Sequence, residues 1–259
     1  MKYVSADEAV KLVKSEDWVF FQGSTAVPVI IQEALARRAD ELRGVNIVSG
    51  FNITNGPAPF CKPEYKESFF VNSVFLCSDQ REYVAQGYGS LIPGFLGEIP
   101  SLIRRREIPI DVACINCSLP DENGYCSYNI SADLAQPAVE SAKIVIAQVN
   151  KSIPYLYGTA MIHESQITAA IECDDPPVDM QFWPPTEIES AIGTYIAAEI
   201  PDGATLQIGV GGIPNAILNG LKDHKHLGLH TEAMTDGVFR LMQMGVIDNS
   251  LKKVEPGRS

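Results

Sequence analysis

The sequence predicts an α/β protein with mainly parallel sheets. Short apolar segments typical of buried strands alternate with amphipathic segments typical of helices, and turns containing glycine or proline separate them. The order strand, turn, helix, strand also occurs twice, once near each end of the chain. With 259 residues, 46% of them hydrophobic, the chain can form one large domain or two moderate ones.

The first repeat occupies the beginning of the chain. Ser5 is predicted to cap a helix, and Glu8 three residues later completes a capping box. The elements that follow are a strand, a turn, a helix and a second strand, at residues 18–21, 23–28, 29–42 and 45–49.

The second repeat begins at Thr186, which has Glu189 at the capping-box position. Its predicted strand, turn and second strand are residues 204–208, 209–214 and 227–231, with a helix after the turn. In both turns four residues separate a glycine from a proline, Gly23 from Pro28 and Gly209 from Pro214. This shared spacing favours a duplicated unit over two unrelated α/β units with the same rhythm.

Three further strands, at residues 68–76, 110–117 and 143–149, lie between the repeats. Residues 174–185 contain two Pro-Pro pairs and are predicted to form a linker. We therefore expect one domain over residues 1–183 and a similar domain over residues 184–259. The second has too few residues to repeat the first, so we expect it to be truncated and the chain to be part of a longer protein.

The net charge of −12 argues against nucleic acid or an anionic membrane as a partner, because the only cluster of basic residues is Arg104-Arg105-Arg106. The chain begins without the basic and apolar segments of a secretory signal, and it has no apolar run long enough to span a bilayer. We expect a cytoplasmic protein.

Six cysteines are then expected to be reduced thiols. Cys114 and Cys117 form a CxxC pair and could, with Cys126, supply three zinc ligands. The alternative is stronger, because Val112 to Ile115 continue an apolar strand and no second CxxC or nearby histidine completes the set. We predict no metal site.

A glycine-rich turn, Gly209-Val210-Gly211-Gly212-Ile213-Pro214, joins a predicted strand directly to a helix. Such a turn lets backbone amides at a helix N-terminus approach an anion closely. A dinucleotide fingerprint fits poorly because the third glycine is missing, and the absence of Gly-Lys-Ser or Gly-Lys-Thr excludes a Walker loop. A tight turn that binds no ligand remains the plain alternative.

Glu232 follows the next predicted strand, within Leu229-His230-Thr231-Glu232-Ala233-Met234. Loops at the carboxyl ends of neighbouring parallel strands share one crevice, so we expect Glu232 to face the amides of Gly211 and Gly212. The plain alternative is a solvated loop carboxylate. His230 points to the other side of the strand from Thr231 and is better explained as a packed or surface residue.

The motifs LQIGVGGIPNAI and GLHTEAMTDG together resemble the second domain of the acetyl-CoA hydrolase/transferase family, especially its 4-hydroxybutyrate CoA-transferases. The segments IPIDVACINCSLPDENGYCS, SAKIVIAQVNKSIP and IHESQI resemble the first domain of that family. The resemblance covers most of the chain in the same order. It implies two domains of the NagB/RpiA/CoA-transferase type, the second truncated here.

The resemblance also implies roles for individual residues. The glutamate of the HTE motif is the nucleophile in this family, and that role falls on Glu232. The CoA-binding residues implied by the glycine loop are Gln207, Gly209, Val210, Gly211, Gly212 and Ile213. Coenzyme A would be a co-substrate, with no permanently bound cofactor, and the other partners would be an acyl-CoA, a short-chain carboxylate and a second copy of the chain in a homodimer.

Two segments depart from the pattern of the family. Tyr155, Leu156 and Tyr157 stand where relatives have polar or basic residues, and the first turn carries Ser24, Thr25 and Ala26. Both segments could face the acyl group, and we predict Ser24 and Thr25 as substrate contacts.

The implied reaction is a ping-pong transfer through a mixed anhydride and a glutamyl-CoA thioester, with amides of Gly211 and Gly212 and the Gln207 side chain as oxyanion donors. The nearest alternative is an acetyl-CoA hydrolase. A sugar-phosphate isomerase would need a basic phosphate clamp, for which Lys222, His224 and Lys225 are available. A non-catalytic ligand-binding or assembly subunit is the third alternative.

Overall fold

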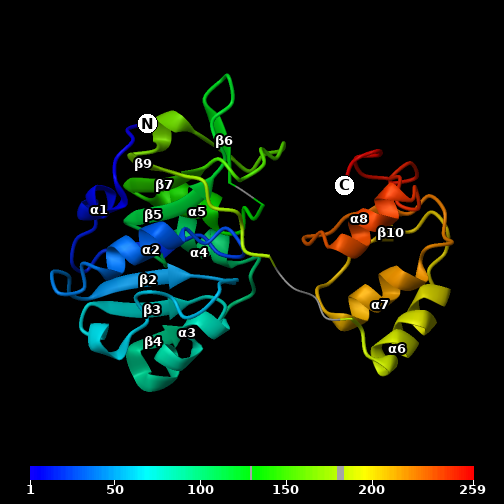
Figure 1. The fold of residues 1–259 in the computed structure, drawn as a ribbon, viewed down its shortest axis with the longest axis horizontal. Coiled ribbons are helices and arrows are strands. Elements are labelled where there is room, and N and C mark those ends of the chain that lie inside the picture. Colours follow the sequence, from blue (N-terminus) through cyan, green and yellow to red (C-terminus); the bar gives the residue numbers. More distant parts are fainter. Residues whose placement is uncertain (129, 180–183) are drawn as a thin grey trace. The chain divides into compact units, whose positions relative to one another are not determined.

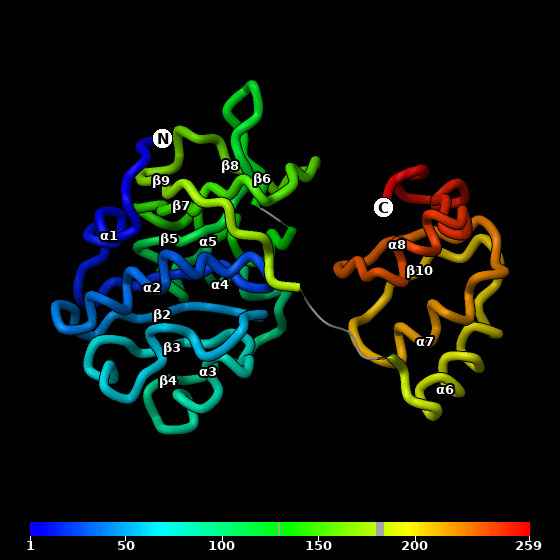
Figure 2. The backbone as a smooth tube through the Cα atoms, in the orientation of Figure 1, coloured from blue at the N-terminus to red at the C-terminus, as the bar shows by residue number. Residues whose placement is uncertain are grey.

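The computed structural model describes residues 1–128, 130–179 and 184–259. The chain forms two compact units, one within residues 1–180 and one within residues 181–259. Figure 1 shows both units, and Figure 2 traces the path of the backbone through each of them. The predicted boundary after residue 183 falls at residues that lie outside the described part of the chain.

The first unit is built on a seven-stranded parallel sheet with the order β4-β3-β2-β1-β5-β7-β9 (Figure 1). Its strands are β1 (Trp18–Phe21), β2 (Val45–Ser49), β3 (Phe69–Ser73), β4 (Gly89–Leu91), β5 (Val112–Cys117), β7 (Ile144–Asn150) and β9 (Ala169–Cys173). The chain moves outward from β1 to β4 and then returns to the other side of β1 at β5. The strand order therefore reverses between β1 and β5, the position at which open α/β sheets form a ligand crevice.

Helices cover both faces of this sheet, as a fully buried parallel sheet requires. They are α1 (Ala6–Ala9), α2 (Val29–Ala36), α3 (Ser78–Tyr83), α4 (Ile99–Arg104) and α5 (Ala135–Ser141), with 3₁₀ turns at Val10–Leu12, Pro63–Tyr65 and Glu164–Gln166 and a π-helical turn at Val84–Tyr88. Residues of α1, α2 and α3 join one buried apolar cluster, and residues of α4 and α5 join another. A small antiparallel pair, β6 (Tyr125–Ser127) and β8 (Met161–His163), lies outside the main sheet.

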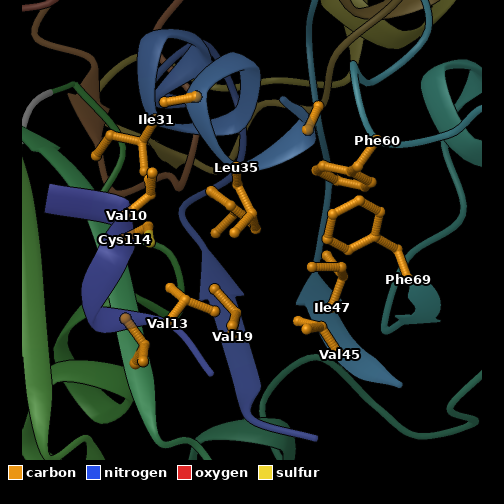
Figure 3. Packing of buried hydrophobic residues seen from close by; sticks show 14 of the residues in the cluster. Val10, Val13, Val19, Ile31, Leu35, Val45, Ile47, Phe60, Phe69 and Cys114 are labelled. Carbon is orange, nitrogen blue, oxygen red and sulfur yellow. The ribbon is translucent and has the colours of Figure 1, made fainter. Parts of the chain in front are cut away.

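The first cluster shows why these segments become strands and helices (Figure 3). Ile31 and Leu35, one helical turn apart on α2, pack with Val19 of β1 and Ile47 of β2. Phe60, from the loop after β2, has its ring 5.6 Å from that of Phe21. Burial of each side chain of this size contributes about 1.5–3 kcal/mol of transfer free energy. The pattern of apolar residues along the helices and strands therefore determines how the helices pack on the sheet.

The second unit contains a parallel pair, β10 (Thr205–Leu206) and β11 (Gly228–Leu229), with helices α6 (Glu187–Ala198), α7 (Gly212–Gly220) and α8 (Asp236–Gln243). Its core comprises Leu206, Leu229, Leu218, Val238 and Leu241, among others. The order strand, turn, helix, parallel strand is thus the same in β1–α2–β2 as in β10–α7–β11. No helix in the described residues has the length and apolar character that a membrane span requires.

The α/β fold with a parallel sheet is confirmed, and most predicted elements lie within one or two residues of their expected positions. Three boundaries were wrong. The strand predicted over residues 68–76 ends at Ser73. The helix predicted over residues 29–42 ends at Ala36 and continues as turns. The second turn ends earlier than predicted, because α7 begins at Gly212 and includes Pro214 in its first turn. A proline is tolerated there because the first-turn amides have no partner within the helix.

Candidate active site

The glycine-rich segment leaves the carboxyl end of β10 and enters α7. Gly211 has φ 135° and ψ −174°, a conformation that only glycine adopts readily, and it precedes the first residue of the helix. The first intrahelical bond runs from the Asn215 amide to the Gly211 carbonyl, 3.2 Å away. The amides of Gly212 and Ile213 come before that bond, so they belong to the donors that an α-helix leaves for an external acceptor.

Glu232 lies at the same edge of the sheet. Leu206 of β10 pairs with Leu229 of β11, and the His230 amide donates to the Leu206 carbonyl at 2.9 Å. The chain continues through Thr231 to Glu232, whose side chain is exposed. The glycine loop and Glu232 therefore emerge from neighbouring strands in the same direction.

Thr231 ties these two segments together. Its hydroxyl donates to the Ile208 carbonyl at 2.9 Å and accepts from the Ile208 amide at 3.1 Å. These side-chain bonds take the place of the next backbone hydrogen bonds between β10 and β11, beyond the point where the strand pairing ends. No role was predicted for Thr231, although a threonine at the end of a strand, directly before the candidate nucleophile, is a signal in the sequence for such a contact.

Glu189 is a second residue with a role that the sequence did not indicate. It completes the predicted capping box with Thr186, which the structure confirms. The same carboxylate also lies against the glycine loop, because a methyl group placed on Gly212 would overlap Glu189 Oε1. This contact depends on the packing of α6 against α7 and has no local sequence signature.

The basic residues considered for a phosphate clamp lie elsewhere. Lys222, His224 and Lys225 follow the C-terminal end of α7, whereas the glycine loop is at its N-terminal end. Nine residues of helix separate the two by about 13 Å. His224 Nε2 is bonded to the Ile200 carbonyl, and the Lys225 amide donates to Asp202. This arrangement does not support the isomerase alternative.

Ser24 and Thr25 belong to the first unit, where they follow β1 at the carboxyl edge of the sheet. Both residues are half-buried. Ser24 has φ 54° and pairs with Asn52 in an isolated parallel β-bridge. They are placed beside the point where the strand order reverses. Gln22, just before them, is fully buried and fixes this point: its amide nitrogen donates to the carbonyls of Tyr128 and Ser131 at 2.6 and 2.7 Å.

The other departure from the family pattern also lies at the carboxyl edge of the first sheet. Tyr155 and Tyr157 follow β7 and pack edge to face, with ring centroids 5.3 Å apart. The Tyr155 hydroxyl donates to Asp121 at 3.0 Å, and the backbone amide of Tyr125 makes the main contribution to holding the pKa of Asp121 below its ordinary value. Asp121, Tyr155 and Tyr157 are among the residues that line an open hollow of about 650 Å³.

The cysteines of the CxxC pair lie within strand β5, as the apolar pattern predicted. Cys114 and Cys117 are buried there, and Cys126 is buried on β6. Burial raises the pKa of Cys114, which opposes the thiolate form that a metal ligand requires. Across residues 1–128, 130–179 and 184–259, no three histidine, cysteine or acidic side chains are grouped so that they could hold a metal ion.

The chain is similar to known proteins along its whole length. Residues 1–180 match the model of the acetyl-CoA hydrolase/transferase N-terminal domain. The whole chain is similar to 4-hydroxybutyrate coenzyme A transferase of Clostridium kluyveri, with 39% identity over 99% of this chain and 59% of that protein.

Solved structures extend the similarity to the fold. A 4-hydroxybutyrate CoA-transferase from Porphyromonas gingivalis superposes with a TM-score of 0.84 at 37% identity, over 99% of this chain and 60% of that one. RipA from Yersinia pestis superposes with a TM-score of 0.92 at 28% identity, over 100% of this chain and 62% of that one. The chain thus spans about three fifths of the length of these relatives. On this evidence, the chain belongs to the acetyl-CoA hydrolase/transferase family.

Proposed function

We propose that the chain is the part of a CoA-transferase that carries its nucleophile, and that the enzyme moves CoA between a short-chain acyl-CoA and a free carboxylate of the acetate or 4-hydroxybutyrate type. The main support is the arrangement in which Thr231 joins the glycine loop to the segment that presents Glu232. A carboxylate beside unpaired helix N-terminal amides combines a nucleophile with donors for an oxyanion. Family membership supports the same chemistry.

In the first half-reaction, a carboxylate oxygen of Glu232 attacks the thioester carbonyl carbon. The carbon–sulfur bond breaks, CoA leaves as a thiolate, and a mixed anhydride remains on Glu232. The thiolate then attacks the glutamyl carbonyl of the anhydride. The free acid leaves as a carboxylate, and a glutamyl-CoA thioester forms. An incoming carboxylate reverses these steps, so the activated acyl bond is conserved through each exchange.

The tetrahedral intermediates place negative charge on an oxygen that the loop can stabilise. We assign the amides of Gly211 and Gly212 and the Gln207 side chain as donors, and the loss of one such donor typically costs about 2.7–4 kcal/mol of barrier. Gly209, Val210 and Ile213 complete the segment that would hold CoA, a co-substrate and not a resident cofactor. Ser24 and Thr25 are proposed to contact the acyl group.

Hydrolysis of acyl-CoA is the second candidate function, because Glu232 is exposed to water. Water that reaches the anhydride or the glutamyl thioester would release free CoA in place of a new thioester. A cytoplasmic location and a homodimer stay predictions.

The two functions are separated by incubating the native protein with acetyl-CoA and isotopically labelled acetate. A transferase moves the label into acetyl-CoA, and rates measured against both substrates give the parallel double-reciprocal lines of a ping-pong reaction. A hydrolase releases CoA without moving label. Label transfer that persists undiminished in a Glu232→Gln variant would contradict the proposal.

A further inference from the structure

Helices α6 and α7 pack through three pairs of residues spaced four apart on each helix. Glu189, Gly193 and Ala197 of α6 face Gly212, Ala216 and Gly220 of α7. A methyl group on Gly193 would lie 2.6 Å from the Ala216 Cβ atom, and one on Gly220 would lie 2.8 Å from that of Ala197. The helices therefore run in the same direction in close contact, with their N-terminal ends side by side.

Glu189 is the only one of these six residues with a long side chain, and it lies where the glycine loop enters α7. Its Oε2 atom accepts from the Thr186 amide at 2.7 Å and from the Thr186 hydroxyl at 2.8 Å. The Thr186 hydroxyl in turn accepts from the Glu189 amide at 3.2 Å. These bonds fix the carboxylate, and the same contacts with Thr186 lower the pKa of Glu189, so the side chain is ionised at neutral pH.

The other carboxylate oxygen, Oε1, lies against Gly212. It is the nearest atom to the position that a Cβ atom on Gly212 would occupy, and the two would overlap. A side chain at Gly212 would therefore have to displace the Glu189 carboxylate and break its hydrogen bonds with Thr186. The carboxylate, held by Thr186, packs against the backbone of the loop at Gly212.

We propose that Glu189 is a positioning residue for the glycine loop: by holding Gly212 from behind, it sets the direction of the amides of Gly212 and Ile213. This role rests on the proposed function, in which the Gly212 amide is an oxyanion donor and Ile213 belongs to the segment that would hold CoA. Oxyanion donors act mainly on the transition state, so misalignment should lower kcat more than it raises KM.

The test is a double-mutant cycle in the native protein with Glu189→Ala and Gly212→Ala, accompanied by Glu189→Gln. Gly212→Ala should lower kcat by about 100-fold, the loss expected when reacting groups are displaced by about 1 Å. The kcat of the double variant should be at least about tenfold higher than that of Gly212→Ala, because removal of the carboxylate makes room for the methyl group. Glu189→Ala alone should lower kcat by about tenfold with KM little changed, whereas Glu189→Gln, which keeps the acceptor for Thr186, should stay within about twofold of the parent.

Glu187→Ala is the matched control, because Glu187 is an exposed carboxylate in the same first turn of α6. It should leave both kinetic constants unchanged. The proposal is overturned if the double variant is no more active than Gly212→Ala, or if Glu189→Ala behaves like Glu187→Ala. If Gly212→Ala does not fold, the comparison of Glu189→Ala with Glu189→Gln and Glu187→Ala still decides.

Urea unfolding of the same variants separates failure of this inference from failure of the proposed function. The steric contact predicts that Glu189→Ala offsets most of the destabilisation caused by Gly212→Ala, whatever reaction the protein catalyses. If the two substitutions are coupled in the free energy of unfolding but the parent protein has no transferase activity, the proposed function is rejected and the contact between Glu189 and Gly212 is retained. Transferase activity without any coupling would reject the role of Glu189 alone.

Discussion

The Thr231 hydroxyl makes two hydrogen bonds to the backbone of Ile208, donating to its carbonyl and accepting from its amide. Ile208 begins the approach to the glycine loop, and Thr231 directly precedes Glu232. The Thr231 side chain therefore bridges the ends of β10 and β11 and helps to set the position of the proposed nucleophile relative to the loop.

Replacement of Thr231 by valine should lower kcat by about 10- to 100-fold, because valine keeps the shape of threonine but loses both bonds and lets the two segments separate. Steady-state kinetics with acetyl-CoA check this. Thr231→Ser keeps the hydroxyl and should retain most of the activity. Equal activity in the valine and serine variants would show that the tie has no catalytic role.

Substitution of Gly211 and of Gly209 by alanine should have different effects on stability. Gly211→Ala should destabilise the second unit by about 1–3 kcal/mol, because φ of 135° strains any residue with a Cβ atom. In Gly209→Ala the new methyl group would lie 3.6 Å from the Pro214 Cγ atom, an ordinary contact, and stability should change by less than about 1 kcal/mol. Urea unfolding followed by circular dichroism measures both, and a similar loss in the two variants would refute the strain argument.

Asp79, at the start of α3, should make the stability of the first unit depend on pH. The side chain is 4% exposed, and burial raises its pKa although Asn52 donates to it at 2.8 Å. The folded state then binds the proton more tightly than the unfolded state, so this carboxyl group lowers stability as pH rises from the unfolded pKa of about 3.9 through the raised folded value.

Asp79→Asn should accordingly increase the free energy of unfolding at pH 7, and the gain should shrink toward pH 4. Urea titrations at both pH values test the sign. Asp40→Asn, which changes an exposed carboxylate, should have little effect at either pH. A destabilised Asp79→Asn protein at pH 7 would mean that the charged form is favoured by the fold.

The fold was largely predictable because its signals are local. Val45–Ser49 is a continuous apolar-rich strand, and the capping box of Thr186 with Glu189 marks the start of α6 as expected. Pro214 misled the prediction of where α7 begins, because proline is compatible both with a turn and with a first helical turn. The helix that begins at Val29 ends at Ala36, and just beyond it Arg38 donates to the carbonyls of Val10 and Val13, a contact with no local sequence signal.

The site was predictable only in part. Gly209–Ile213 and Glu232 were predicted from their positions after two strands and from family motifs; the structure has both segments at one edge of one sheet, and their roles stay predictions. The contacts of Thr231 with Ile208 and of Glu189 with Gly212 join residues 23 positions apart in each case. They follow from strand register and helix packing, which a single sequence does not specify. Ser24 and Thr25 lie in the other unit, and their contact with the acyl group stays a prediction.

The identity of the nucleophile is tested most directly by trapping the glutamyl thioester. Native protein is incubated with acetyl-CoA, reduced with sodium borohydride, digested, and analysed by peptide mass spectrometry, with Glu232→Gln as the control. The proposed mechanism predicts that the peptide containing Glu232 carries the side-chain alcohol formed by reduction of the thioester, and that the control peptide is unchanged. An unmodified Glu232 in protein that is exchanging label between acetate and acetyl-CoA would contradict it.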